Sequence, residues 1–137
     1  MKREELIIAS IPSELTRIEE LALHIADTAK LTQEQSDNMA IVLTELVNNA
    51  IIHGNKNDPS KTVTISTTFT DEFVRVSIRD EGKSFNPDKI ANPTDPENLW
   101  KESGRGIFLV RNLIDQVDFN PTDKGMEIII TEFLKKN

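Results

Sequence analysis

Polar side chains interrupt the otherwise apolar run TELVNNAIIHGN, which extends from Thr44 to Asn55. Asparagine is a poor residue in a helix interior, because its side chain competes for backbone hydrogen bonds. Successive helical residues lie about 100° apart, so Glu45, Asn49 and His53 would share one stripe beside the apolar face. A carboxamide oxygen can bind a hard cation such as Mg²⁺, and a glutamate one turn earlier can accept a proton from an attacking hydroxyl. Either this stripe lines a site, or it is an ordinary solvated face at a fraying helix end.

The segment RDEGKSFNP, residues 79–87, ends a strand pattern with an acidic residue. Asp80 has the same parity as the apolar Val74 and Ile78, so it is predicted to point to the core side of the sheet. An unpaired carboxylate is costly there, and an adenine amino group would supply a hydrogen-bond donor to it. Gly82 would let the backbone turn closely around a flat ring. The alternative is that Asp-Glu-Gly merely ends the strand with a turn.

A third segment, SGRGIFLV at residues 103–110, places Gly104 and Gly106 directly before a helical pattern. The exposed amides of a helix N-terminus attract phosphate oxygens. The segment is not a Walker A loop, because Gly-Lys-Ser/Thr is missing, and no strand of a parallel unit leads into it. Any loop-to-helix junction can carry Gly-x-Gly. The order of the three segments nevertheless suggests one nucleotide site, with metal, base and phosphates bound in turn.

The first half of the chain is predicted to form a strand and two helices. Residues 5–11 read as a short strand, and Ser13 is the expected N-cap of an amphipathic helix. Thr32 and Gln35 have the spacing of a capping box, which would begin the second helix. That helix is expected to run through the first motif and to stop at Gly54 in the left-handed conformation.

The second half is predicted to be mostly strands. Residues 61–69 and 73–80 form a hairpin, residues 104–117 a helix, and residues 117–121 and 126–134 a closing hairpin around the turn TDKG. Between residues 82 and 103, three prolines and the lack of periodicity predict a long loop. The pattern indicates an α+β fold, a two-layer α/β sandwich with a mixed, mostly antiparallel sheet covered on one face by helices.

Composition and charge restrict the classes of function. A chain of 137 residues is expected to form one domain, and its net charge of −7 argues against direct binding of nucleic acid or of an anionic membrane. The absence of cysteine makes an intracellular address the default. No apolar run approaches the roughly 20 residues that span a bilayer. We therefore expect a cytoplasmic protein.

The three motifs together resemble those of the GHKL ATPase superfamily, which has the Bergerat ATP-binding fold. ELVNNAIIHGN is similar to its N box, DEGKSF to its G1 box and GRGIF to its G2 box. Within that superfamily the chain most resembles the bacterial anti-sigma factor serine/threonine kinases, which carry NAIIHG nearly letter for letter. The resemblance implies a single histidine-kinase-like ATPase domain over residues 1–137, with an ATP lid at about residues 83–103.

The resemblance also implies roles for individual residues. Asn49 matches the asparagine that binds Mg²⁺, Glu45 the general base toward the acceptor serine, and Asp80 the aspartate that reads adenine. Arg17 aligns with an arginine that some relatives use to contact both sigma factor and anti-anti-sigma factor; otherwise it is a solubilising charge. The other implied ATP-binding positions are His53 (with a structural role first), Gly82, Ser84, Gly104, Arg105, Gly106, Ile107 and Phe108.

Two positions depart from the family pattern. Ser84 stands where the superfamily has its second G1 glycine, although several serine kinases also look to have serine there. Gly125-Met126 stands where relatives often have glycine and threonine, so one contact on the adenine side is expected to differ.

The function that the resemblance implies is that of an anti-sigma factor and protein serine/threonine kinase. Such a protein binds ATP and Mg²⁺, phosphorylates a serine of an anti-anti-sigma (STAS) protein, sequesters a sigma factor and usually forms a homodimer. One alternative is a non-catalytic, ATP-dependent switch module that only binds its partner. Another is a detached ATPase module of a histidine kinase, but His24 lies in LALHIAD without a phosphoacceptor box and no dimerisation helix pair precedes the domain.

Overall fold

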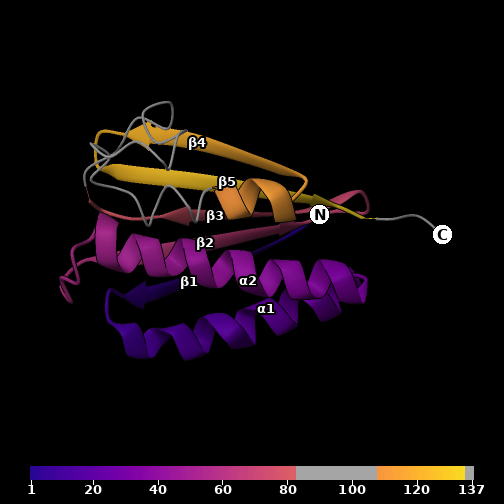
Figure 1. Ribbon diagram of the computed structural model, residues 1–137, viewed down its shortest axis with the longest axis horizontal. Helices are drawn as coiled ribbons and strands as arrows, with labels where there is room; N and C mark the ends of the chain where they lie inside the picture. Colours follow the sequence, from indigo (N-terminus) through magenta and orange to yellow (C-terminus); the bar gives the residue numbers. More distant parts are fainter. Residues whose placement is uncertain (83–107, 135–137) are drawn as a thin grey trace.

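The computed structural model describes residues 1–82 and 108–134, and the strands of these residues form one antiparallel sheet in the order β1-β2-β3-β5-β4. The strands are β1 (Lys2–Ala9), β2 (Thr62–Phe69), β3 (Phe73–Arg79), β4 (Gln116–Thr122) and β5 (Gly125–Phe133). The helices are η1 (Pro12–Glu14), α1 (Leu15–Ala29), α2 (Gln33–Asn49), η2 (Ala50–Gly54) and an unlabelled helix at residues 108–113. Figure 1 shows the helices on one face of the sheet. The predicted α+β class is confirmed, and the pairings among the described strands are all antiparallel.

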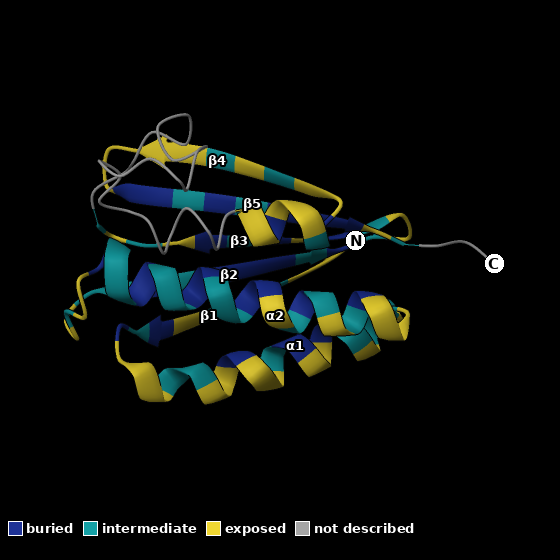
Figure 2. Ribbon diagram, in the orientation of Figure 1, coloured by how far each residue is buried: buried dark blue, intermediate teal, exposed yellow. Residues whose placement is uncertain are grey.

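The core lies between the helices and the inner face of the sheet. The apolar stripe of α1 is buried at Ile18 and Ile25, as its three- and four-residue spacing predicts. α2 contributes a second buried stripe, which includes Leu43 and Leu46. Across the sheet the strand register aligns the inward-facing side chains of neighbouring strands, so that Ile78 pairs with Ile65 on one side. Figure 2 shows this buried layer in β2, β3, β5 and the inner sides of the helices.

Two boundaries differ from the sequence prediction. Ser13 is not a helix N-cap, because Pro12 begins a 3-10 turn and α1 starts only at Leu15, without a side-chain cap. The last helix was expected to reach Val117, but it ends at residue 113 and β4 begins at Gln116. The Asp115 carboxylate accepts a hydrogen bond of 2.8 Å from the backbone N–H of Phe133 in β5, which turns the chain into the sheet.

The start of α2 is fixed by the predicted capping box. The Thr32 hydroxyl accepts a hydrogen bond of 3.2 Å from the Gln35 backbone N–H, and Gln35 Oε1 accepts one of 3.1 Å from the Thr32 backbone N–H. Gln35 also donates from Nε2 to the Phe133 carbonyl at 2.9 Å. Gln35 therefore ties the first turn of α2 to the end of β5.

Removing the side chain of the true N-cap, Thr32, should lower the stability of the fold, whereas removing that of Ser13, which caps no helix, should not. We expect Thr32→Ala to lower the free energy of unfolding by about 1 kcal/mol, because a backbone N–H of the first turn loses its acceptor. Ser13→Ala removes an exposed hydroxyl that caps no helix, so it should leave the free energy of unfolding unchanged. Urea denaturation of both variants measures the difference, and equal losses would contradict this account of the two helix starts.

Candidate functional site

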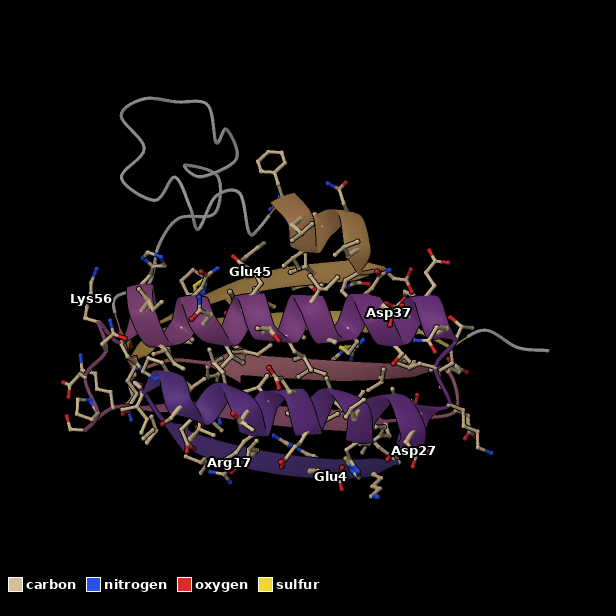
Figure 3. All side chains as sticks on the ribbon, turned by 60° about the horizontal axis from the view of Figure 1, so that its bottom comes forward. Glu4, Arg17, Asp27, Asp37, Glu45 and Lys56 are labelled. Atoms are coloured by element: carbon tan, nitrogen blue, oxygen red, sulfur yellow. The ribbon has the colours of Figure 1, made fainter. Side chains whose placement is uncertain are left out.

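The polar stripe of α2 lies on the flank of the helix away from α1, where Figure 3 labels Glu45. Glu45 and Asn49 are both half-buried, one helical turn apart. Asn49 Nδ2 donates a hydrogen bond of 3.3 Å to Glu45 Oε1. The carboxamide oxygen accepts no hydrogen bond from any described residue, and it is the atom type that a hard cation prefers.

After Asn49 the helix changes its winding. Residues Ala50–Gly54 form the π-helical turn η2, closed by a 2.8 Å hydrogen bond from the Asn55 N–H to the Ala50 carbonyl. π turns inside α-helices occur frequently at functional sites. His53 lies half-buried in this turn.

The predicted left-handed Gly54 is wrong. No described glycine has a positive φ, and the chain instead reverses at Lys56 and Asn57, with φ of 55° and 56°. Gly54 is required for a different reason, because a Cβ at this position would clash with the Asp80 carboxylate.

The Asp80 carboxylate follows directly on β3 and is held by backbone amides. Asp80 Oδ1 accepts hydrogen bonds of 2.9 Å from the Gly82 N–H and 3.2 Å from the Met126 N–H. The Asp80 N–H donates to the Met126 carbonyl at 3.0 Å, so the residue is tied to β5 in both directions. The expected core-side orientation is confirmed. Asp80 Oδ2 accepts no hydrogen bond from the described residues, and it lies beside Gly54 at the end of η2.

Three glycines pack directly around this aspartate. A Cβ at Gly82 would overlap the Gly54 carbonyl, and a Cβ at Gly125 would overlap the Asp80 carbonyl. Backbone from the end of the α2–η2 helix, from the turn after β3 and from the start of β5 therefore meets at Asp80. The structure thus brings together the end of the first motif and the second motif, which are separate in sequence.

Burial dominates the electrostatics of Asp80. Desolvation raises the pKa of its carboxyl, and the hydrogen bonds from the Gly82 and Met126 amides only partly offset that rise. Met126, the position that departs from the family pattern, contacts Asp80 through its backbone, and its side chain is buried in the core.

Several predicted site residues lie outside the described residues. These are the expected lid at residues 83–103 and the positions Ser84, Gly104, Arg105, Gly106 and Ile107. Phe108 is the first residue described after this gap; it lies in the helix that ends at residue 113, and its side chain is exposed. The described residues therefore include the first and second of the three predicted motifs, and the third lies largely outside them.

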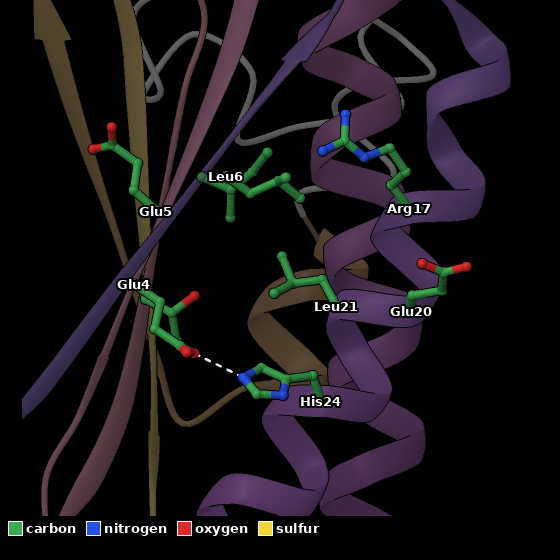
Figure 4. A pocket seen from close by; sticks show the side chains of 9 residues that line it. Glu4, Glu5, Leu6, Arg17, Glu20, Leu21 and His24 are labelled. Carbon is green, nitrogen blue, oxygen red and sulfur yellow. Dashed lines mark hydrogen bonds and ion pairs between the residues drawn. The ribbon is translucent and has the colours of Figure 1, made fainter.

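Arg17 lies in a separate groove between α1 and β1 (Figure 4). Its Nη1 is 2.9 Å from Glu14 Oε2, and the groove has a volume of about 350 Å³ with lining residues that include Glu4, Glu20 and His24. His24 Nε2 lies 2.8 Å from Glu4 Oε1, and this hydrogen bond lowers the pKa of Glu4. The groove shares no lining residue with the Asp80 turn.

Sequence reasoning missed Asn55. It is fully buried directly after η2, and its side chain bonds to the turn that carries Asp80. The only signal in the sequence was a third asparagine just beyond the helix, which is equally common in an exposed turn.

The described side chains suit a Mg²⁺ ion that is shared with substrate phosphates better than a metal ion bound by protein ligands alone. Among residues 1–82 and 108–134 there is no group of three histidine, cysteine, aspartate or glutamate side chains that could enclose a metal ion. Mg²⁺ usually keeps several waters and binds one or two protein oxygens together with substrate phosphates. The carboxamide oxygen of Asn49 fits that mode. In the same parts of the chain, no helix is long and apolar enough to cross a membrane.

Comparison with solved structures and with a family profile identifies the class. The structure of the RsbU and RsbW domains of Rv1364c from Mycobacterium tuberculosis matches this whole chain with a TM-score of 0.73, at 13% identity and over 34% of that chain. The histidine kinase domain from Erythrobacter litoralis EL346 matches with a TM-score of 0.59, at 20% identity, over 89% of this chain and 60% of that one. At these identities the likeness establishes the fold alone. The profile of the histidine kinase-like ATPase domain matches residues 8–132, which defines the class of protein.

Relatives with higher identity narrow the family. The anti-sigma F factor of Bacillus cytotoxicus is 34% identical over 111 residues, which are 77% of this chain and 75% of that protein. Those of Anoxybacillus flavithermus and Geobacillus thermodenitrificans are each 33% identical over the same length and shares. The chain therefore belongs to the histidine kinase-like ATPase family, in the group of the anti-sigma F factors.

Removing the charge of Asp80 should stabilise the protein at neutral pH. The raised pKa means that ionising this carboxyl costs more in the folded chain than in the unfolded chain. That cost is full above the raised pKa and disappears as the pH falls below the ordinary value of 3.8. We expect Asp80→Asn to have a higher thermal midpoint than the wild type at pH 7, and the difference to vanish in acid.

Thermal unfolding followed by circular dichroism between pH 3 and pH 7 measures this difference. Asp71→Asn is the control, because Asp71 is exposed in the turn between β2 and β3. A lower thermal midpoint for Asp80→Asn than for the wild type at pH 7 would mean that the ionised carboxylate stabilises the fold, which contradicts the prediction.

Proposed function

We propose that this protein is an anti-sigma factor and a protein serine/threonine kinase, which binds Mg-ATP, phosphorylates a serine of an anti-anti-sigma (STAS) protein and sequesters a sigma factor. The observation that carries the proposal is the half-buried Asp80 carboxylate, held against Gly54 at the end of η2, with Oδ1 bonded to two backbone amides and Oδ2 to no described residue. Membership in the family of the anti-sigma F factors supports the sigma factor as partner. The homodimer and the contact of Arg17 with both partners belong to the same proposal.

In this proposal the adenine base and the Mg²⁺ ion bind at opposite ends of the same nucleotide site. Asp80 Oδ2 accepts a hydrogen bond from the adenine amino group, which repays part of the desolvation of the carboxylate. Asn49 supplies its carboxamide oxygen to Mg²⁺, and the metal neutralises charge on the phosphates when bound. His53 supports the end of the helix between them. The glycines Gly104 and Gly106 are proposed to bind phosphate through their backbone amides.

Glu45 is proposed as the general base. The hydroxyl oxygen of the acceptor serine attacks the γ-phosphorus, the bond to the ADP oxygen breaks, and the hydroxyl proton passes to the Glu45 carboxylate. The hydrogen bond from Asn49 Nδ2 to Glu45 Oε1 orients that carboxylate, so its second oxygen is the one left to accept the proton. Most of the rate then comes from position and charge neutralisation, as is general for phosphoryl transfer.

Changing Glu45 to glutamine should separate chemistry from binding. In the Glu45→Gln variant the new side chain keeps an oxygen that accepts from Asn49 but cannot take the proton. We therefore expect phosphotransfer to fall by about 100-fold or more while ATP binding persists. The measurement is transfer of labelled γ-phosphate to a STAS protein encoded beside this chain, with the phosphoserine mapped. Asp37→Asn is the matched control, because Asp37 is an exposed carboxylate on the same helix.

The same assay distinguishes the alternatives. Unchanged transfer in Glu45→Gln would remove Glu45 from the chemistry. If the wild type transfers no phosphate to its partner but binds that partner in an ATP-dependent manner, the non-catalytic switch module is the correct function.

The proposed metal ligand can be tested by nucleotide binding alone. We expect Asn49→Ala to weaken ATP binding about tenfold when Mg²⁺ is present, because the Mg²⁺ ion loses one of its oxygen ligands. With EDTA the variant and the wild type should bind ATP equally. Asn48→Ala is the control, since this neighbouring asparagine points about 100° away around the helix. Equal affinities of Asn49→Ala and wild type in Mg²⁺ would refute the assignment.

A further inference from the structure

A buried polar network lies directly behind the Asp80 turn, and Asn55 is at its centre. Asn55 and Ser10 are both completely buried. Asn55 Nδ2 donates hydrogen bonds of 2.7 Å to Ser10 Oγ and 3.0 Å to the Thr62 carbonyl. Ser10 Oγ in turn donates to the Lys61 carbonyl at 2.8 Å. The network joins the residue after β1, the residue after η2 and the start of β2.

The side-chain oxygen of Asn55 binds the backbone of the second motif. Asn55 Oδ1 accepts a hydrogen bond of 2.7 Å from the Glu81 backbone N–H, between Asp80 and Gly82. The Glu81 carboxylate also accepts hydrogen bonds from the Thr62 backbone N–H and hydroxyl. The turn is therefore fastened on its η2 side by Asn55 and on its β5 side by the Met126 backbone.

This second attachment is needed because Asp80 lies beyond the regular sheet. The last register pair between β3 and β5 is Arg79 with Glu127, so among the described residues Asp80 is bonded on that side to Met126 alone, through its own N–H and its Oδ1. These bonds hold the Asp80 N–H and carboxylate, whereas the peptide group between Asp80 and Glu81 is bonded through its N–H to Asn55. The bond to the fully buried Asn55 restrains that peptide group, and with it the backbone that carries both the Asp80 carboxylate and the Gly82 N–H that binds it. An asparagine that is completely buried is costly unless its groups are paired, and here they are.

We propose that Asn55 is a positioning residue of the nucleotide site, which sets base selectivity by fixing the direction of Asp80 Oδ2. This inference rests on the proposed function, because it assumes that Asp80 reads the base. Asn55 itself touches no ligand in this account and acts through the Glu81 N–H. A purine with an amino group at C6 would donate to a correctly directed Oδ2, whereas a carbonyl at C6 would face it with another acceptor.

The test compares binding of ATP and of inosine triphosphate, which differ at C6 in carrying an amino group or a carbonyl. We expect the wild type to prefer ATP by about tenfold or more. Asn55→Ala should reduce that preference at least about threefold, because the carboxylate is no longer held in one direction. General destabilisation would lower the affinity for both nucleotides together and leave the ratio unchanged.

Ser10→Ala is the matched control. It breaks the same buried network on the side away from the turn and leaves the Glu81 N–H bonded to Asn55. Its thermal midpoint should fall while its preference for ATP stays at the wild-type ratio. An Asn55→Ala protein with the wild-type ratio, or a Ser10→Ala protein whose ratio falls equally, would overturn the proposal.

Two further measurements keep the result interpretable. If Asn55→Ala does not fold, amide hydrogen exchange of the wild type decides: the Glu81 N–H should be strongly protected before nucleotide is added, and rapid exchange would overturn the inference. The wild-type ratio tests the proposed function separately. The proposed site itself would be refuted if the wild type bound no nucleotide, or if it showed no preference for ATP that the Asp80→Asn substitution removes. A wild-type preference for ATP that Asn55→Ala leaves unchanged would refute only the role of Asn55.

Discussion

The Asp80 carboxylate lies half-buried at the point where β3 ends, and much of the surrounding structure exists to hold it there. Its ionised form is disfavoured by burial, which raises the pKa, yet two backbone amides, from Gly82 and Met126, are directed at one of its oxygens. Such an arrangement costs stability unless a ligand completes it. A partly buried carboxyl with a raised pKa is a candidate for a functional group, and for this reason the proposed function assigns Asp80 to the base.

Holding Asp80 in this place restricts the backbone of three segments, two of which are distant from it in the sequence. Gly54, Gly82 and Gly125 each lack a Cβ where one would strike the aspartate or a neighbouring carbonyl. The winding of the helix also changes before it reaches this point, because η2 replaces the last α-helical turn. The glycines in this part of the site are therefore explained by close packing of backbone against backbone and not by left-handed conformation.

The features that could be predicted from the sequence are those that depend on local patterns of residues. Alternating apolar residues located β2 and β3 to within a residue, and the spacing of Thr32 and Gln35 predicted a capping box whose hydrogen bonds are present. Contacts between distant residues were not predictable in this way. Ser13 had the right type for a cap but follows Pro12, which starts a tighter turn, and Gly54 is determined by Asp80, 26 residues further on. Asn55 could not be distinguished from an exposed turn asparagine, because its partners Ser10, Thr62 and Glu81 come from three other segments.

The attachment of α2 at both ends explains how its polar stripe and Asp80 keep a fixed relation. At its start, Gln35 is bonded to the Phe133 carbonyl in β5, 98 residues away. At its end, Gly54 and Asn55 pack against the turn that carries Asp80. A helix held to the sheet at both ends cannot slide along it, so the distance between the Asn49 amide and the Asp80 carboxylate is set by the fold before any ligand arrives. Preorganisation of this kind is what allows a site to bind a metal at one end of a nucleotide and its base at the other without ordering both at the moment of binding.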